Sequence, residues 1–587
     1  MSFTPSAPPP SSSSSAALAV RRVRFTSRWE DVSNDTSGGE LERAQVVEVT
    51  LVNLLPGRVQ SRETSLTVVP GVLHRLVPAD QAHVDVLVVG SSNADGSRNA
   101  TVQVVRKDGG SSEVIAVSEG WETSPLLQEW PADPEVIRTH ETPTWWNHAK
   151  FGIFVHWGVY SFPAWAPPSQ YAEWYNWDLH NPPDASNPTW NHHIETFGKE
   201  LIYDDFIANF TASKFNASEW IDLFDRAGAK YFVFVTKHHD GFALFDTGNT
   251  THRSSVYFGP KRDFLAELME TAKKEKPDMH RGTYYSLPEW FNPDSARYGF
   301  GSWPGGLAHN AFNDTQIEPY TGRLEINDYV EDLQFPHMLD LAMKYETEIM
   351  WCDIGGPNKA VEFASQFYTN AMKTGRQVTM NNRCGAVPDF DTPEYATFGA
   401  IQPQSWESNE GMDPFSYGLN SATQAVQYKN GTTIVQTLVD IASKNGNFLL
   451  DVGPNAEGEI IPAMQQGLLD AGEWLSYSGE CVYDTHYWFQ SSQDRGAPTG
   501  SQPARFLTTP TTFCIVTFDK PQDNMLAIRQ RLPILDGDEV ALLLPGGEKR
   551  NVSWSVDKGT GHLAVQVEQA DVDAVKYAWT VQVRYRD

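Results

Sequence analysis

Both ends of the chain show short apolar runs separated by polar turn residues, which is the pattern of an all-β domain. In the first block these runs are rich in Val and occupy residues 44–55, 83–90, 101–106 and 113–117. We therefore predict an N-terminal β-sandwich-like domain over residues 21–130. A Pro/Ser-rich lead at 1–20, expected to be disordered, precedes it, and a proline-containing linker at 131–144 follows it.

The pattern changes between residues 145 and 485, where strand-like runs alternate with helical periodicity. The apolar runs lie at 151–157, 231–237, 282–287, 348–353, 378–382, 398–403 and 447–452. Between them, residues 262–275 and 326–346 have the spacing of amphipathic helices, and Pro336 should kink or split the second. Repeated strand–helix units predict a (β/α)8-like, TIM-type barrel. A doubly wound sheet is the alternative, but no G-x-G-x-x-G motif follows a strand.

Residues 486–587 return to the β-rich pattern of the first block. Apolar runs lie at 505–518, 539–545, 562–568 and 577–585. They predict a C-terminal β-sandwich. The expected fold class is therefore α/β, with a TIM-type barrel flanked by a β-sandwich on each side.

Composition and charge narrow the classes of function. The 587 residues include 45 Lys and Arg against 74 Asp and Glu, which gives a formal net charge of −29. Such a chain repels phosphate backbones and anionic lipid, so we expect no nucleic-acid partner and no membrane association. No apolar run approaches the roughly 20 residues of a membrane-spanning helix. The oligomeric state is left open.

Cysteines and glycosylation sequons bear on the compartment. The cysteines, Cys352, Cys384, Cys481 and Cys514, are too few for a disulfide scaffold and lack the paired spacing of a zinc site. The N-x-S/T sequons begin at Asn34, Asn99, Asn209, Asn216, Asn249, Asn313, Asn430 and Asn551. This number favours a secreted glycoprotein, although the first residues lack the basic and apolar regions of a signal peptide.

Polar side chains gather where the apolar runs of the middle block stop, which is where a (β/α) barrel carries its catalytic groups. They are His156, His238, His239, Asp240, Tyr284, Tyr285, Glu289, Asp353 and Arg383. Adjacent strand residues point to opposite faces, so both histidines of the HHDGF string can serve one site only if the backbone leaves the pleat there. No further ligand stands at a zinc-site spacing, so hydrogen bonds to sugar hydroxyls suit them better than a metal.

Asp353 is the most informative of these residues. An acid that closes an apolar strand is costly to bury unless it is paired or catalytic. Capping of the following Gly-Gly-Pro turn is the structural alternative, and a lone histidine such as His156 is often only a structural hydrogen-bonding group.

The motifs of the middle block resemble those of glycoside hydrolase family 29, the α-L-fucosidases. The most specific are HWG at 156–158, HHDGF at 238–242 and NFLL-x-x-GP at 447–454, in this order. Further matching strings are YAEWY (171–175), YYSLPEW (284–290), EIMWCD (348–353), NNRCG (381–385) and SWES (405–408). The resemblance covers roughly residues 145–485 and implies a barrel followed by a β-sandwich. The N-terminal domain lies outside the usual family core.

The resemblance also implies a retaining exo-glycosidase that releases L-fucose by double displacement. The family nucleophile corresponds to Asp353, which would form a covalent fucosyl-enzyme. Two residues correspond to candidate acid/bases: Glu394, in DFDTPEY (389–395), which we prefer, and Glu407, in the SWES string. Either is alternatively a surface acid or, for Glu394, an acid at a helix start.

Other positions match residues that bind the sugar or flank the two carboxyl groups. They are His156, Glu173, Trp174, His238, His239, Tyr285, Trp351 and Arg383, with Tyr285 preferred over Tyr284. The implied substrate is a fucosylated oligosaccharide or glycoconjugate, with no cofactor and no metal. Cys352 and Ile354 depart from the family pattern, which often has a polar residue and Gly beside the nucleophile.

Two rival hypotheses remain. The first is a catalytically inactive carbohydrate-binding member of the same fold, and the presence of Asp353, Glu394 and Glu407 argues against it. The second is another retaining exo-glycosidase, such as an α-galactosidase, which the histidine set disfavours.

Overall fold

The computed structural model describes residues 18–33, 41–53, 67–76, 80–89, 99–108, 111–298, 305–356, 358–385, 388–490 and 503–586. The chain divides into two compact units, one ending at Leu126 and one running from Leu127 to Arg586. Most of the predicted Pro/Ser-rich lead lies outside the described residues, and the first strand already begins at Leu18.

The first unit consists of small antiparallel sheets around an aliphatic core. Its main sheet has the order β1-β2-β4-β3, built from β1 (Leu18–Ser33), β2 (Leu41–Asn53), β4 (Gln81–Val88) and β3 (Thr67–Val69). Two short pairs accompany it, formed by β5 (Asn99–Ala100) with β8 (Trp121–Glu122) and by β6 (Gln103–Asp108) with β7 (Ser111–Val117). Val104 of these pairs belongs to the same apolar cluster as Val47 and Val49 of β2, and Trp121 packs against that cluster.

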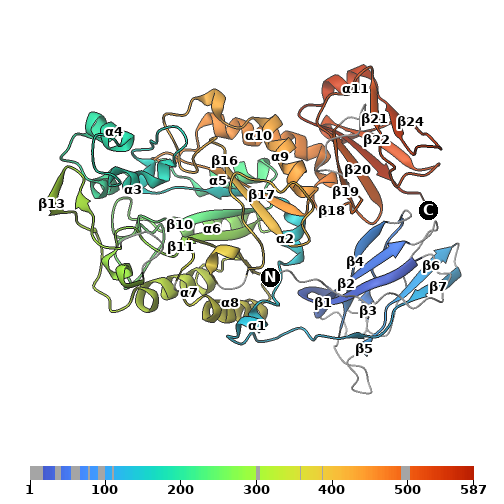
Figure 1. The fold of residues 1–587 in the computed structure, drawn as a ribbon, viewed down its shortest axis with the longest axis horizontal. Helices are drawn as coiled ribbons and strands as arrows, with labels where there is room; N and C mark the ends of the chain where they lie inside the picture. The colour runs from blue at the N-terminus through green and yellow to red at the C-terminus, as the bar shows by residue number, and fades with distance from the viewer. Residues whose placement is uncertain are drawn as a thin grey trace. The chain divides into compact units, whose positions relative to one another are not determined.

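A curled parallel sheet forms the centre of the second unit (Figure 1). Its order is β15-β14-β11-β10-β9-β17-β16. The strands are β9 (Phe151–Val155), β10 (Tyr231–Lys237), β11 (His280–Ser286), β14 (Ile349–Asp353), β15 (Thr379–Met380), β16 (Trp406–Gly411) and β17 (Gly446–Val452). This sheet confirms the prediction of a TIM-type barrel.

Residues 389–395 close the barrel between its two edge strands. Parallel bridges join Asn381, just after β15, to Phe390, and Asp391 to Trp406 of β16. A third bridge joins Glu394 to Asn409. This segment is therefore extended and holds the place of an eighth strand. The expected strand at 398–403 does not form, because the chain enters β16 only at Trp406.

Alternation along the strands separates the barrel interior from the helical layer. Phe154, Val233, Tyr284, Trp351 and Leu449 belong to one interior cluster. The residues of opposite parity join the larger core formed with the surrounding helices.

Helices follow most of the strands and cover the outside of the barrel. They are α5 (Ala217–Arg226), α6 (Phe264–Glu275), α7 (Phe335–Met343), α8 (Ala360–Thr374), α9 (Gly431–Ala442) and α10 (Pro462–Ser478). Shorter helices are α1 (Pro134–Ile137), α2 (Thr144–Ala149), α3 (Tyr175–Leu179) and α4 (Pro188–Phe197). Pro336 stands in the first turn of α7, directly after a π-helical turn, Val330–Gln334, which splits the expected long helix. A hairpin of β12 (His309–Asn310) and β13 (Asn313–Ile317) lies between β11 and this turn.

The chain ends in a second β-structure that packs on the barrel helices. A sheet of order β18-β19-β20-β26-β22-β23 faces a three-stranded sheet of order β21-β25-β24 across an apolar core. The strands are β18 (His486–Tyr487), β19 (Ala504–Thr508), β20 (Thr512–Thr517), β21 (Met525–Ile528), β22 (Glu539–Leu544), β23 (Glu548–Asn551), β24 (Ser553–Val556), β25 (Leu563–Gln566) and β26 (Trp579–Arg584), with α11 (Gln569–Ala574) before the last. Figure 1 shows these strands beside α9 and α10, where Trp474 Nε1 donates to the Ala578 carbonyl at 2.9 Å.

The four cysteines form two disulfides, which the sequence did not indicate. Cys352 pairs with Cys384 inside the barrel unit, and Cys481, after α10, pairs with Cys514 of β20. Among the described residues, no helix combines the length and the apolar character needed to cross a bilayer.

Candidate active site

Asp353 ends strand β14, and three groups orient its carboxylate. Tyr284 Oη donates to Oδ2 at 2.8 Å, and Arg383 Nη1 donates to Oδ1 at 3.0 Å. The Ile354 backbone N–H donates to Oδ1 at 2.9 Å. The turn-capping interpretation explains only the last of these contacts. Since 13% of the side chain stays exposed, the carboxylate is fixed in orientation but accessible.

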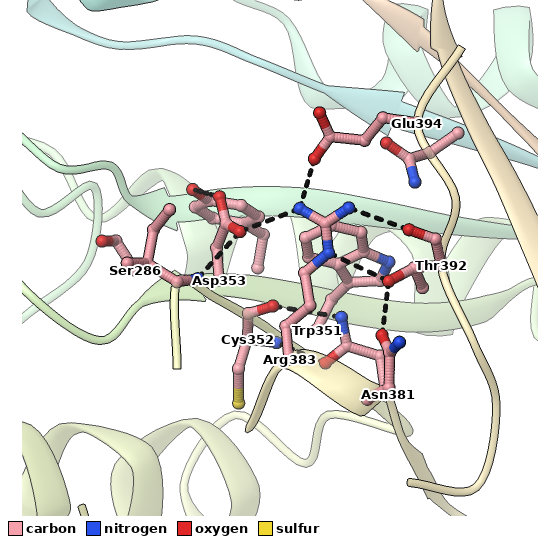
Figure 2. Close-up of polar contacts among 12 residues, drawn as sticks. Ser286, Trp351, Cys352, Asp353, Asn381, Arg383, Thr392 and Glu394 are labelled. Atoms are coloured by element: carbon pink, nitrogen blue, oxygen red, sulfur yellow. Dashed lines mark hydrogen bonds and ion pairs between the residues drawn. The ribbon is translucent and has the colours of Figure 1, made fainter. Parts of the chain in front are cut away.

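Arg383 joins two carboxylates at the carboxyl end of the barrel (Figure 2). Its Nη1 donates both to Asp353 Oδ1 and to Glu394 Oε1. Thr392 holds the rest of the guanidinium, through Oγ1 at 3.0 Å from Nε and through its carbonyl at 2.8 Å from Nη2. The guanidinium lies 4.9 Å from the centre of the Trp351 ring. Burial alone would lower the pKa of Arg383, but the carboxylates of Asp353 and Glu394 outweigh burial and raise that pKa.

The segment that closes the barrel, residues 389–395, brings Glu394 beside Arg383. Its backbone is extended and bridges to Asn409 of β16, so the helix start considered for the TPE string does not form. Glu394 keeps 33% of its side chain exposed, and Tyr171 Oη lies 3.4 Å from its Oε2.

The shared nitrogen limits the separation of the two carboxylates. Because the bound oxygens of Asp353 and Glu394 accept from one nitrogen, and a hydrogen bond spans at most about 3 Å, these oxygens lie within about 6 Å of each other. Retaining glycosidases place their carboxyl groups about 5–5.5 Å apart, and inverting ones about 6.5–9.5 Å apart. The spacing therefore suits a retaining pair.

Glu407 lies elsewhere, in the closed interior of the barrel. It is fully buried, its Oε2 accepts from Tyr231 Oη at 2.5 Å, and its Oε1 accepts from Trp351 Nε1 at 3.0 Å. Glu407 is the second residue of β16 and Tyr231 the first of β10, so this contact is near the amino ends of strands. Burial raises the pKa of Glu407 to about 7, against the opposing effect of the two hydrogen bonds.

His156 and His238 are buried beside Tyr284. His156 Nδ1 shares a 2.6 Å hydrogen bond with Asp451 Oδ1. The His238 ring stacks on Tyr284 at 5.8 Å, and its Nδ1 has no hydrogen-bond partner among the described residues. Burial holds the pKa of both histidines well below the usual range, so both rings are neutral. A buried polar atom without a protein partner requires a water, an ion or a ligand to satisfy it.

His239 faces Asp353 in a defined tautomer. Strand β10 ends at Lys237, so the chain has left the pleat as both histidines require. The Ser286 hydroxyl uses its one hydrogen to donate to the Pro288 carbonyl at 2.7 Å. Ser286 Oγ must therefore accept from His239 Nδ1, which lies 2.6 Å from it and carries the proton. Burial, assisted by the Lys237 cation, lowers the pKa of His239. Nε2, 3.6 Å from Asp353 Oδ2, therefore carries a lone pair.

Glu173 and Trp174 lie in the short 3-10 turn Ala172–Trp174. Glu173 is buried and accepts from Gly418 N at 2.8 Å and Ser416 Oγ at 3.1 Å. Burial raises its pKa to about 7, so a neutral, proton-donating form is present near neutrality. The Trp174 ring meets His239 edge to face at 5.5 Å.

The structure places Tyr284, and not the preferred Tyr285, beside Asp353. Tyr285 points into the helical layer, where its hydroxyl lies 3.0 Å from His337 Nδ1 of α7. Tyr284 has the opposite parity, points into the barrel and donates to Asp353. Consecutive strand residues face opposite sides, so only one of the pair can reach the site.

Three supporting residues escaped the sequence prediction. Thr392 binds Arg383, Asn381 binds the backbone N–H and carbonyl of Cys352, and Asp451 binds His156. All three lie within motifs named above, in DFDTPEY, NNRCG and NFLL-x-x-GP, so membership of these motifs could have identified them. Among the described residues, no three His, Cys, Asp or Glu side chains gather as a metal site would require.

Comparisons with known proteins all lead to one family. The family model described as Alpha-L-fucosidase matches residues 123–480. An alpha-L-fucosidase of Dictyostelium discoideum is 34% identical over 373 residues, covering 62% of this chain and 76% of that protein. A plasma alpha-L-fucosidase of Rattus norvegicus is 30% identical over 463 residues, covering 76% and 92% respectively. The crystal structure of Thermotoga maritima alpha-fucosidase with a mechanism-based inhibitor superposes with a TM-score of 0.65 at 29% identity, covering 78% of this chain and all of that one.

Proposed function

Because this chain belongs to the alpha-L-fucosidase family, we propose that it cleaves α-L-fucosidic linkages with Asp353 as nucleophile and Glu394 as acid/base. The protein is a glycoside hydrolase, and fucosylated glycans are its class of substrate. One observation carries the assignment of roles: both carboxylates bind the same guanidinium nitrogen at the carboxyl end of the barrel.

In the first step, the Asp353 carboxylate attacks the anomeric carbon of the fucosyl group. Glu394, protonated, gives its proton to the glycosidic oxygen as the carbon–oxygen bond breaks. The products are the free aglycone alcohol and a fucosyl ester of Asp353. Accessibility supports both roles, because each side chain keeps an exposed portion.

In the second step, Glu394 removes a proton from water, and the resulting hydroxide attacks the same anomeric carbon. The ester bond breaks and the Asp353 carboxylate returns. Two inversions give net retention of configuration.

Arg383 suits this sequence because it contacts both residues. Before the first step, Asp353 is negative and Glu394 is neutral; in the intermediate, the Asp353 ester is neutral and Glu394 is negative. The guanidinium therefore faces one negative charge throughout, and that charge moves from one of its contacts to the other. A fixed cation can stabilise both states without reorganising.

Glu407 does not suit the acid/base role. Its carboxylate is fully buried and both its oxygens are bound by interior side chains, Tyr231 and Trp351. A group that transfers protons to a glycosidic oxygen must come within hydrogen-bond reach of it.

The remaining residues supply contacts for the sugar. Neutral His239 offers the lone pair on Nε2 to a hydroxyl group, and His238 offers an unpartnered Nδ1. Glu173 can donate or accept near neutral pH. Trp174, beside His239, provides an aromatic wall that suits the C6 methyl group of fucose.

We also propose that the protein is a secreted glycoprotein acting on oligosaccharides or glycoconjugates outside the cell. All four cysteines are paired, as is usual in oxidising compartments. Asn34 lies outside the described residues, and the other sequon asparagines are exposed. Removal of N-glycans from protein made in a secretory host should increase its electrophoretic mobility; unchanged mobility together with free thiols would contradict the proposal.

The decisive experiment follows hydrolysis of an aryl α-L-fucoside by NMR. The wild type should release α-L-fucose first, and Asp353→Gly should lose about 10⁴-fold or more in kcat. Azide should then restore turnover of Asp353→Gly by giving the inverted β-fucosyl azide. Initial release of β-L-fucose would contradict double displacement.

The same assay separates the rival hypotheses. Binding of fucose without turnover by the wild type would identify an inactive sugar-binding protein. Faster hydrolysis of an aryl α-galactoside than of the fucoside would indicate a different exo-glycosidase.

A further inference from the structure

The Cys352–Cys384 disulfide lies immediately beside the two residues that form the central ion pair. Cys352 precedes Asp353, and Cys384 follows Arg383. Figure 2 shows Cys352 directly below this contact. The disulfide therefore links the backbone of the proposed nucleophile to the backbone of its arginine.

The sheet itself does not hold these residues together. The β14–β15 ladder consists of two pairs and stops at Met350 and Met380, three residues before Asp353 and Arg383. Beyond it, Asn381 substitutes for a strand by accepting from Cys352 N at 2.9 Å and donating to Cys352 O at 3.0 Å. The disulfide, with its Cα atoms 4.8 Å apart, is the covalent link across this gap.

The backbone beyond Asp353 is unfavourable and needs such support. Ile354 has φ 67°, a region that β-branched residues avoid, and Gly355 and Gly356 follow with φ 49° and 111°. Gly385, directly after Cys384, also has positive φ, at 87°. Strained segments persist only where their surroundings fix them.

We propose that Cys352 and Cys384, as a disulfide, are positioning residues that hold Arg383 against Asp353 and Glu394. This inference rests on the proposed roles of Asp353 and Glu394. Because Arg383 Nη1 contacts both carboxylates, any displacement of its backbone alters both steps of the reaction. Small misplacements of reacting groups have large effects on rate.

The second disulfide provides a matched control. The two bonds join residues 32 and 33 positions apart, so each restricts the unfolded chain to nearly the same extent. All four cysteines are fully buried. Cys481–Cys514, however, joins the 3-10 turn Gly479–Cys481, which follows α10, to the C-terminal sheet.

The test compares Cys352→Ala/Cys384→Ala with Cys481→Ala/Cys514→Ala on an aryl α-L-fucoside, well below both melting temperatures. We expect kcat of the first variant to fall about 10- to 100-fold with little change in KM. The second should lose stability but keep its kcat. Equal kcat in the two variants would overturn the proposal.

A double-mutant cycle shows whether the disulfide acts through Arg383. In an Arg383→Lys background, removal of Cys352 and Cys384 should cost much less in kcat than in the wild type. Fully additive losses would overturn the proposal.

If the first variant does not fold, the wild type is reduced and alkylated under native conditions and tested in its place. Mass spectrometry then identifies the opened disulfide, and circular dichroism checks that the protein is still folded. Full kcat after alkylation of Cys352 and Cys384, or free thiols there in the active wild type, would also overturn it.

These outcomes are distinct from a failure of the proposed function. If Asp353→Gly hydrolyses the fucoside as fast as the wild type does, the proposed function is contradicted, whatever the cysteine variants do. Collapse in Asp353→Gly, combined with wild-type kcat in Cys352→Ala/Cys384→Ala, would remove only the positioning role.

Discussion

Glu394 and Glu407 occupy two contrasting regions of one barrel. Glu394 lies at the open end, partly exposed and paired with Arg383. Glu407 lies in the closed interior, fully buried, with Tyr231 and Trp351 as donors. Trp351 separates the two regions, since its N–H contacts Glu407 while its ring faces Arg383. A glutamate side chain is thus partly exposed beside an arginine in one region and is a fully buried hydrogen-bond acceptor in the other.

The sharpest test of this contrast removes each glutamate in turn. Glu394→Ala should lower kcat about 10²- to 10⁴-fold for a fucoside with a poor leaving group. With an activated aryl α-L-fucoside, whose first step needs no acid, azide should attack the accumulated fucosyl-enzyme, restore turnover and give the retained α-fucosyl azide, because the nucleophile is intact. The measurement is steady-state kinetics with NMR of the product.

Glu407→Ala is the matched comparison for that experiment. It should keep most of its kcat and show no azide effect, but lose stability, because two buried donors lose their acceptor at about 1–3 kcal/mol each. Azide rescue of Glu407→Ala, and not of Glu394→Ala, would reverse the assignment.

A smaller effect is expected from Arg383→Lys, which keeps the charge but removes the planar fork. Lysine cannot contact Asp353, Glu394 and Thr392 at once, so we expect kcat to fall about 10- to 100-fold. Unchanged kcat would show that the shared guanidinium is not part of the mechanism.

The tyrosine pair tests the difference between the two faces of strand β11. Tyr284→Phe removes the donor to Asp353 and should lower kcat/KM about 10-fold, equivalent to one hydrogen bond to a charged group. Tyr285→Phe, which faces His337, should leave kcat/KM unchanged. A larger loss in Tyr285→Phe would restore the original assignment.

The smallest effect on activity is expected from Glu407→Gln, whose main consequence is on the pH dependence of stability. The folded pKa of about 7 exceeds the reference value of 4.5, so between these pH values the folded state retains a proton that the unfolded state has lost. The free energy of unfolding therefore falls as pH rises through this window, by roughly 3 kcal/mol at about 1.4 per unit.

Denaturant titrations between pH 4.5 and 8 check this prediction. In Glu407→Gln, the free energy of unfolding should fall less steeply as pH rises. It should still fall, because the pKa of Glu173 is also raised to about 7 and contributes a decrease of the same sign. An unchanged pH profile in the variant would show that Glu407 is ionised in the folded protein.

The sequence by itself determined the fold class and the family. Continuous apolar strands alternating with helical periods indicate a parallel α/β fold, because strands buried on both faces carry few polar residues until they end, and the family resemblance selects the barrel. That is why Asp353, His156 and His238 were recognisable as candidate site residues. The choice between Tyr284 and Tyr285, by contrast, needed the register of β11 against β14, in which Tyr284 pairs with Trp351 and Ser286 pairs with Asp353.

Only the tertiary structure decided what the acids do and which cysteines pair. Glu394 and Glu407 stand 13 positions apart in similar polar strings, and nothing local distinguishes them. Their difference arises because residues 389–395 close the barrel at its open end, whereas β16 takes Glu407 into the interior. Likewise, Cys352 and Cys384 meet because β14 and β15 are neighbours in the sheet. Solvent exposure and long-range pairing depend on how distant segments pack, and these are the properties that set a carboxyl group's chemistry.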